Sequence, residues 1–317
     1  MNRKIFDFFD TTKSHRIVER LRAGESVNLS NVKDGLKGFL ALYLREATKG
    51  HLLYITATDR EALAKAERLA QWAPDNVLYF PEEPIHDYFS DVHSREITEK
   101  RMQVLEQLLG RRKYVICTSV SNLLKKMPAS RALRKRFLTL KPGMTLEPDD
   151  LAAQLSDRGY IRVSQVESTG QYAKRGEIVD VFPVGAATGV RADFFDDELE
   201  SLKQMDMATQ RSALTLTRIK IAPVRESILS RGEREQLLKT MAARYGGAAH
   251  AALIDRLLAE PMEHDETFSA FSGEGSSLES YLGKQAVIFW DEWEQAAERS
   301  EERRVGKECR SRWSPYH

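Results

Sequence analysis

The sequence predicts an α/β protein in which a parallel-sheet domain is interrupted by a smaller α+β domain. In the first third of the chain, apolar strand-like segments alternate with segments whose apolar residues recur at helical spacing. This alternation is typical of a parallel sheet covered by helices on both faces. The middle of the chain has several short alternating strands, and an apolar strand returns near residue 285. We therefore expect the last segment to complete the first sheet.

These patterns divide the chain into four parts. Residues 1–135 form the first part of the parallel-sheet domain, 136–222 the inserted domain and 223–300 the return segment. Residues 301–317 are basic and have neither helical nor strand period. We expect them to be a non-native tail. The natural protein would then continue past residue 300 with a different sequence.

In the first domain, apolar spacing and end signals predict helices and strands in alternation. The helix at 59–72 is expected to be capped by Asp59. The expected elements are a short helix over 16–21, a short strand over 25–29, a helix ending at Gly50, a strand over 51–57, a helix over 59–72, a strand over 76–80, a helix over 94–110, a strand over 113–119 and a short helix to 127.

The passage around residue 30 is where a nucleotide-binding fold places its phosphate loop, GxxxxGK[ST]. With Gly35 as the second glycine, Ser30 stands at the first glycine, Leu36 at the lysine and Lys37 at the Ser or Thr. The loop thus lacks its cationic anchor and its Mg²⁺-binding hydroxyl. We expect no ATP binding here; the alternative is that Lys33 or Lys37 substitutes for the missing lysine.

Two further features of the first part allow more than one interpretation. His86 and His93 with Asp87 and Asp91 match no familiar metal-ligand spacing, so packing or surface histidines are favoured over a metal site. The basic cluster at 131–136, RALRKR, is favoured as a solvated connecting face, with phosphate contacts as the alternative.

The inserted domain is expected to begin with a strand, a Pro-Gly turn and a helix that Asp149 or Asp150 caps and Gly159 ends. It is expected to close with a strand in SALTLTRIKIAP. After residue 222 we expect helices over 233–244 and 250–258, a loop at 273–277, and an apolar strand over 284–290.

The central stretch, 171–207, predicts short strands with one charged and aromatic face. In each strand, alternate residues face opposite ways. The expected pairs of faces are Ile178, Asp180 and Phe182 against Glu177, Val179 and Val181; Val190, Ala192 and Phe194 against Arg191, Asp193 and Phe195; and Leu199, Ser201 and Lys203 against Glu200, Leu202 and Gln204.

Phe195 thus lies on a polar face beside Arg191, with Lys174 and Arg175 entering from the preceding turn. An aromatic ring among arginines has the composition of a protein-binding hot spot. A half-buried hairpin with a solvated charged side is the alternative. The nearby carboxylates lack a neighbouring His or Cys, so metal binding is disfavoured; they are Asp193, Asp196, Asp197, Glu198 and Glu200.

Four segments resemble a known family in the same order. They are FPEEPIHDYFSDVHSREITEKRMQVLEQL, YAKRGEIVDVFP, VRADFFDDELESLKQMD and ATQRS. They resemble the N-terminal region of the bacterial transcription-repair coupling factor (Mfd) family, over most of residues 1–300. The resemblance implies a degenerate helicase-like domain without nucleotide motifs and an inserted UvrB-like domain that binds the damage-recognition protein UvrA. Residues at matching motif positions are Arg175, Arg191 and Phe195.

The resemblance also implies a role in transcription-coupled nucleotide excision repair. Full-length family members are ATP-dependent translocases on double-stranded DNA that displace stalled RNA polymerase, with ATP and Mg²⁺ in motor domains that this chain lacks. For this chain we expect no catalysis, no cofactor and no metal. The alternatives are a non-specific DNA-binding domain or a residual ATP-dependent helicase-like domain.

Composition excludes several other classes. The 317 residues include 48 Lys and Arg against 47 Asp and Glu, so the net charge of +1 gives no global attraction to nucleic acid or membranes. Two cysteines, Cys117 and Cys309, cannot build a disulfide scaffold. No apolar run approaches the ~20 residues that span a bilayer, and no signal peptide is evident. We expect a cytoplasmic protein with no membrane partner.

Overall fold

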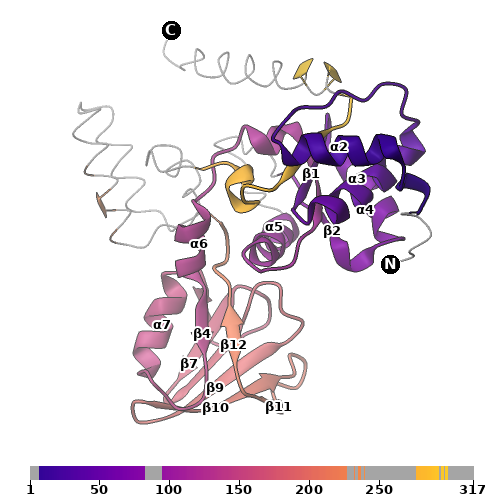
Figure 1. Ribbon diagram of the computed structural model, residues 1–317. Helices are drawn as coiled ribbons and strands as arrows, with labels where there is room; N and C mark the ends of the chain where they lie inside the picture. The colour runs from indigo at the N-terminus through magenta and orange to yellow at the C-terminus, as the bar shows by residue number, and fades with distance from the viewer. Residues whose placement is uncertain are drawn as a thin grey trace. The chain divides into compact units, whose positions relative to one another are not determined.

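The computed structural model describes residues 7–82, 95–226 and 276–292, with a few single positions between and after them. The chain divides into two compact units (Figure 1). The first comprises Met1–Ile97, Val104–Lys126 and Ser277–His317, and the second Thr98–Gln103 and Met127–Ser276. The predicted limits at residues 136, 223 and 301 stay predictions.

The first unit is built on a parallel four-stranded sheet in the order β13-β1-β3-β2. All residues of β1 and β3 are buried, so both faces of the sheet are covered, as the alternation of strands and helices predicts. The strands are β1 (Leu52–Thr56), β2 (Val77–Tyr79), β3 (Val115–Ser119) and β13 (Val287–Trp290). The helices are α2 (Thr12–Arg22), α3 (Asp34–Thr48) and α4 (Asp59–Ala70), while α5 (Arg95–Leu108) contributes to both units.

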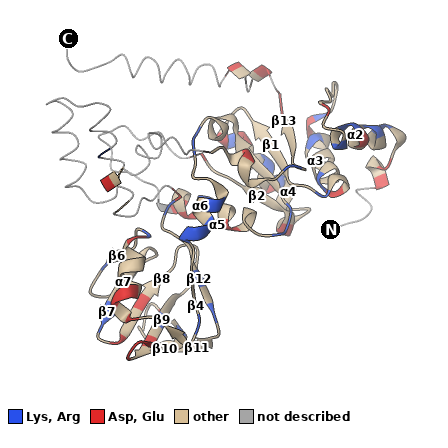
Figure 2. Ribbon diagram, turned by 60° about the vertical axis from the view of Figure 1, so that its left-hand side comes forward, with Lys and Arg blue, Asp and Glu red and all other residues tan. Residues whose placement is uncertain are grey.

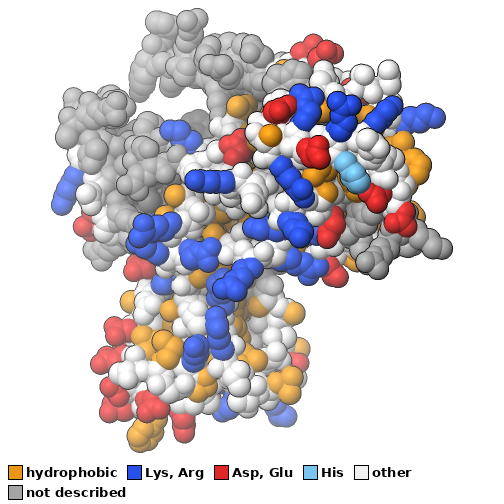
Figure 3. Space-filling model, viewed as in Figure 1, with side chains coloured by type: hydrophobic (Ala, Val, Ile, Leu, Met, Phe, Trp, Pro, Cys, Tyr) orange, Lys and Arg blue, Asp and Glu red, His pale blue; other side chains and the backbone are white. Residues whose placement is uncertain are grey.

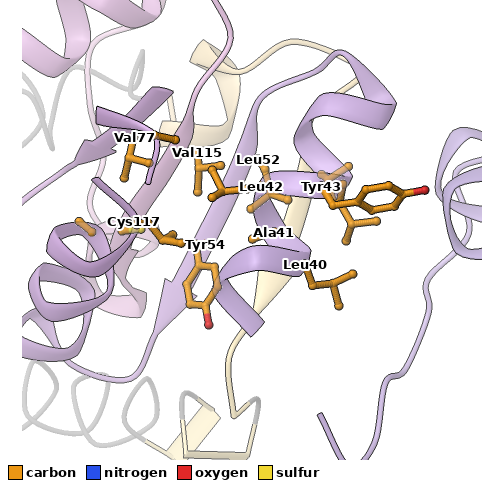
Figure 4. Close-up of a cluster of buried hydrophobic side chains, with 14 of the residues drawn as sticks. Leu40, Ala41, Leu42, Tyr43, Leu52, Tyr54, Val77, Val115 and Cys117 are labelled. Carbon is orange, nitrogen blue, oxygen red and sulfur yellow. The ribbon is translucent and has the colours of Figure 1, made fainter. Parts of the chain in front are cut away.

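The core of this unit lies between α3, α4 and one face of the sheet (Figure 4). Leu40 and Leu44 of α3 pack with Leu52 and Tyr54 of β1. Leu52 and Tyr54 are two residues apart, so their side chains point to the same face of the sheet. The backbone approaches closely where α3 ends: a Cβ on Gly50 would lie 2.1 Å from the carbonyl oxygen of Gln285. Only glycine fits there, and this contact brings the segment before β13 against the start of β1.

Several local predictions for the first unit are wrong. No strand forms over 25–29, because Ser26–Val32 stands off from β13 and lines a hollow beside it. Thr58, not Asp59, caps α4: the Thr58 hydroxyl accepts from the Glu61 amide at 3.3 Å, and the Glu61 carboxylate accepts from the Thr58 amide at 3.1 Å. After β3, a single 3-10 turn, Val120–Leu123, replaces the expected helix.

The second unit is an α+β structure around a seven-stranded sheet in the order β11-β10-β9-β8-β7-β6, with β5 paired to β10. A separate antiparallel pair joins β4 and β12. Among the described residues of this unit up to 226, two helices besides α5 form, α6 (Ser130–Arg136) and α7 (Pro148–Ser156). The strands are β4 (Leu138–Leu140), β5 (Met144–Thr145), β6 (Ile161–Arg162), β7 (Gln171–Arg175), β8 (Ile178–Phe182), β9 (Gly189–Phe195), β10 (Glu198–Met205), β11 (Ser212–Leu216) and β12 (Ile219–Ile221).

The main hydrophobic core of this unit packs against one face of the sheet. Leu151 and Leu155 of α7 and Leu140 of β4 pack on the inward residues of β8 and β9, such as Val179 and Ala192. The helix α7 begins at Pro148 without a side-chain cap, so the predicted capping by Asp149 or Asp150 is wrong. A proline at the first helical position needs no amide partner, which makes a side-chain cap less necessary.

The alternation predicted for β8 and β9 is confirmed, but that for β10 is wrong in its second half. A register shift between Leu199 and Ser201 makes both Leu199 and Leu202 buried. Such a bulge inserts one extra residue and therefore reverses the facing of everything after it. The helices expected over 233–244 and 250–258, the loop histidines His86 and His93, and Cys309 lie outside the described residues.

Candidate functional site

The outward side of the seven-stranded sheet carries polar and aromatic side chains. We call the surface formed by Arg175, Asp180, Arg191, Asp193, Phe195 and Lys203 the outer face. It arises because the neighbours of these residues along β8 and β9 point into the core and are buried. All three predicted site residues, Arg175, Arg191 and Phe195, lie on it.

Asp180 is the anchor of the outer face, and its side chain is only 1% exposed. It stands directly opposite Arg191 in the β8–β9 pairing. Arg191 donates from Nε to Oδ1 of Asp180 at 2.7 Å and from Nη2 to Oδ2 at 2.9 Å. Arg175 donates to the same Oδ2 at 3.0 Å. One buried carboxylate thus holds two guanidinium groups, and its charge is compensated on the spot.

The two arginines differ in how many of their guanidinium donors remain available to a partner protein. The Arg191 side chain is 19% exposed, and the forked edge of its guanidinium already faces Asp180. The hydrogen bonds to Asp180 raise the pKa of Arg191 above its ordinary value. The Nε and Nη2 donors of Arg191 are therefore already occupied within the chain. Arg175 is 54% exposed and uses one Nη donor on Asp180, so its other donors face solvent.

Phe195 ends β9 and is 73% exposed. It pairs with Glu198 across a two-residue turn, whose first residue, Asp196, has a φ of 58°. Aspartate tolerates this left-handed conformation better than most residues, so the turn can be tight without glycine. The turn after Arg175 lies at the same end of the sheet, where the Phe194 amide donates to the Glu177 carbonyl. Phe195 and Arg175 are therefore presented at one end of the outer face.

A second carboxylate supports this face. Asp193 accepts from Ser201 Oγ at 2.8 Å and from Lys203 Nζ at 2.7 Å. Burial alone would raise the pKa of Asp193, but the hydrogen bonds from Lys203 and Ser201 outweigh burial and lower it. The sequence interpretation missed the role of Asp180. The available signal was a single carboxylate in the otherwise apolar strand IVDVF, at a position that alternates with the core residues Val179 and Val181.

The degenerate phosphate loop of the first unit has a different chemistry from a nucleotide site. Lys37 donates to Asp291 at 2.7 Å and to Glu292, and Asp291 also accepts from the Tyr54 hydroxyl at 2.6 Å. Burial works to lower the pKa of Lys37, but these two carboxylates outweigh it and raise the pKa. The lysine that could substitute for the missing loop lysine is thus neutralised within the chain. Among the residues that the structure describes, no group of three His, Cys, Asp or Glu could hold a metal ion.

Comparisons with known proteins identify the second unit. Residues 138–226 match the family model described as the UvrB interaction domain. The chain is 30% identical to the transcription-repair-coupling factor of Haemophilus influenzae over 198 residues, which cover 62% of this chain and 17% of the relative. It is 28% identical to that of Escherichia coli over 214 residues, covering 68% and 19%. Over these residues the chain is similar to the transcription-repair-coupling factors, and its segment 138–226 is similar to the UvrB interaction domain.

The matched segment, residues 138–226, contains the whole outer face, from Arg175 to Lys203, and both strands of the β4–β12 pair. The chain spans less than a fifth of the length of these curated relatives, including that of Bacillus subtilis at 26% identity. No helix among the described residues is long and apolar enough to cross a membrane.

Proposed function

We propose that this chain recruits UvrA in transcription-coupled repair, through the outer face of its UvrB interaction domain. The observation that carries this proposal is the exposure of Phe195 at the same end of that face as a half-exposed Arg175. An aromatic side chain that fills an apolar pocket, next to an arginine with free donors, is the typical centre of a protein interface. The domain match and the names of the relatives support the choice of partner.

In this proposal the residues have different roles. Phe195 and Arg175 contact UvrA directly, and Arg175 offers its free donors to an acidic group. Arg191 acts as a positioning residue, because its two hydrogen bonds to Asp180 fix the surface on which Arg175 also rests. Translocation on double-stranded DNA, ATP hydrolysis and contact with RNA polymerase would belong to parts of the full-length protein outside this chain.

The test is calorimetric titration of UvrA into the chain, comparing Phe195→Ala with the matched variant Leu214→Ala. Leu214 is also exposed (67%) and lies on β11 of the same sheet. Phe195→Ala should weaken binding by roughly 30-fold or more, the loss typical of a hot-spot aromatic. Leu214→Ala should leave affinity unchanged. Equal binding by both variants, with unchanged circular dichroism, would remove Phe195 from the interface and with it the proposed face.

Arginine variants separate contact from positioning. Arg175→Ala should weaken UvrA binding while leaving the unfolding temperature nearly unchanged, since this side chain is more than half exposed. Arg191→Ala should weaken binding and also lower the unfolding temperature, because it leaves the buried Asp180 with one partner. If Arg191→Ala weakened binding without any loss of stability, Arg191 would be a direct contact instead.

A further inference from the structure

A basic pocket lies on the second unit, between α6 and the C-terminal end of α7. It is lined by four cationic side chains, Arg131, Lys135, Arg136 and Arg158, and by one carboxylate, Asp157. The remaining lining residues are two alanines, Ala129 and Ala132. Small side chains between cations let a charged ligand approach the surface closely. Four positive charges against one negative charge give the basic pocket a local excess that the nearly neutral chain as a whole lacks.

Arg158 forms the floor of the basic pocket and is half-buried. It donates from Nε to the Arg136 carbonyl at 2.8 Å and from Nη1 to the Gln154 carbonyl at 2.7 Å. These carbonyls fix the guanidinium group but carry no full negative charge. Burial lowers the pKa of Arg158; the neighbouring Asp157 opposes this shift, and Arg136 adds to it. The side chain is thus an immobilised cation, and no ion pair of Arg158 occurs among the described residues.

Arg131 and Lys135 form the rim. They are four residues apart on α6, so they lie on the same side of the helix, and both are exposed. In the described part of the chain neither has a hydrogen bond or an ion pair. Like charges at this spacing repel each other by a few tenths of a kcal/mol. An anion placed between them and Arg158 would remove this repulsion.

The basic pocket and the outer face lie on opposite sides of the same unit. The helix α7 packs through Leu151 and Leu155 on the inward side of the sheet, whereas the outer face is on the other side. Figure 2 shows α6 largely in the colour of Lys and Arg. Figure 3 shows acidic side chains gathered at the end of this unit that is distant from α6. A ligand in the basic pocket would therefore leave Phe195 and Arg175 accessible.

We propose that the basic pocket binds the phosphodiester backbone of duplex DNA without regard to sequence. The cations are spread over an open surface that spans α6 and the end of α7, so they can contact several phosphates at once. Recognition by charge alone favours a polyanion, which releases counterions when several phosphates are neutralised together. This inference goes beyond the recruitment of UvrA and does not depend on it.

The experiment is a titration of the chain into a fluorescein-labelled duplex of about 20 base pairs, followed by anisotropy at several salt concentrations. With about three phosphates neutralised, the logarithm of affinity should fall with the logarithm of salt at a slope of about −3. The double variant Arg131→Ala/Lys135→Ala should bind at least 10-fold more weakly at low salt. Its slope should be smaller by about 2, roughly one for each cation removed.

The matched control is Lys141→Ala, which removes one exposed lysine in the turn between β4 and β5 of the same unit. It should keep the affinity and the slope of the wild type, and all variants should keep their circular dichroism and their titration with UvrA. The proposal is overturned if the wild type does not bind duplex, or if the double variant keeps the wild-type affinity and slope. It is also overturned if inorganic phosphate, at matched ionic strength, displaces the duplex, which would indicate a small-anion site.

Discussion

Replacement of Asp180 by asparagine tests the anchor of the outer face. The carboxylate accepts three charge-assisted hydrogen bonds, two from Arg191 and one from Arg175. An asparagine has one acceptor oxygen, and its amide group would face guanidinium donors, so two of the three bonds are lost. Such bonds contribute about 1.5–3 kcal/mol each when buried. Because water reaches both arginines, we discount this sum and expect a loss of about 2 kcal/mol.

The assay is differential scanning calorimetry of the full chain, together with the UvrA titration. For a unit of roughly 150 residues, a loss of about 2 kcal/mol lowers the unfolding midpoint by about 4–8 °C. Asp193→Asn is the matched control, since Asp193 lies on the same face but its side chain is 20% exposed. It should cost less than about 1 kcal/mol. Equal midpoints for the two variants would refute the argument that burial makes Asp180 the anchor.

Two further predictions concern the first unit. Burial, with Lys113 and Arg45 nearby, lowers the pKa of His51 from 6.5 to about 4, so the native chain keeps it neutral while the unfolded chain protonates it first. The free energy of unfolding should be constant above pH 6.5 and should fall by up to about 3 kcal/mol as the pH drops to 4. In urea titrations at several pH values, His51→Asn should remove most of this fall. Lys37→Ala should cost about 1–2 kcal/mol by removing a partner of the buried Asp291. Mg-ATP should shift neither the wild-type nor the Lys37→Ala melting midpoint, whereas a shift in the wild type alone would identify a working nucleotide site.

The elements that were predicted correctly are those determined by local periodicity. The apolar residues of β8 and β9 alternate without interruption, so their facing follows from the sequence alone. The parallel sheet of the first unit follows likewise from the alternation of apolar strands and helices. Phe195 was predicted to be exposed on the polar face because it occupies an odd position after Val190, and the structure confirms this.

The elements that were missed depend on pairing between distant residues. The role of Asp180 requires that β8 and β9 align Asp180 with Arg191, and a shift by one residue would have separated them. The bulge in β10 has no periodic signal, because it reflects where β5 and β9 pair with it. The failure of 25–29 to form a strand depends on the hollow beside β13, which residues far along the chain help to form.

The pairing of Leu52 with Val287 also determines the order in which the chain can fold during synthesis. Every strand of the seven-stranded sheet has left the ribosome before β13 is made. Until then β1 has an open edge, and Gly50 has no Gln285 backbone to pack against. Domains fold as units once their residues are available. The outer face can therefore form before the four-stranded sheet of the first unit gains β13, its last strand in the sequence.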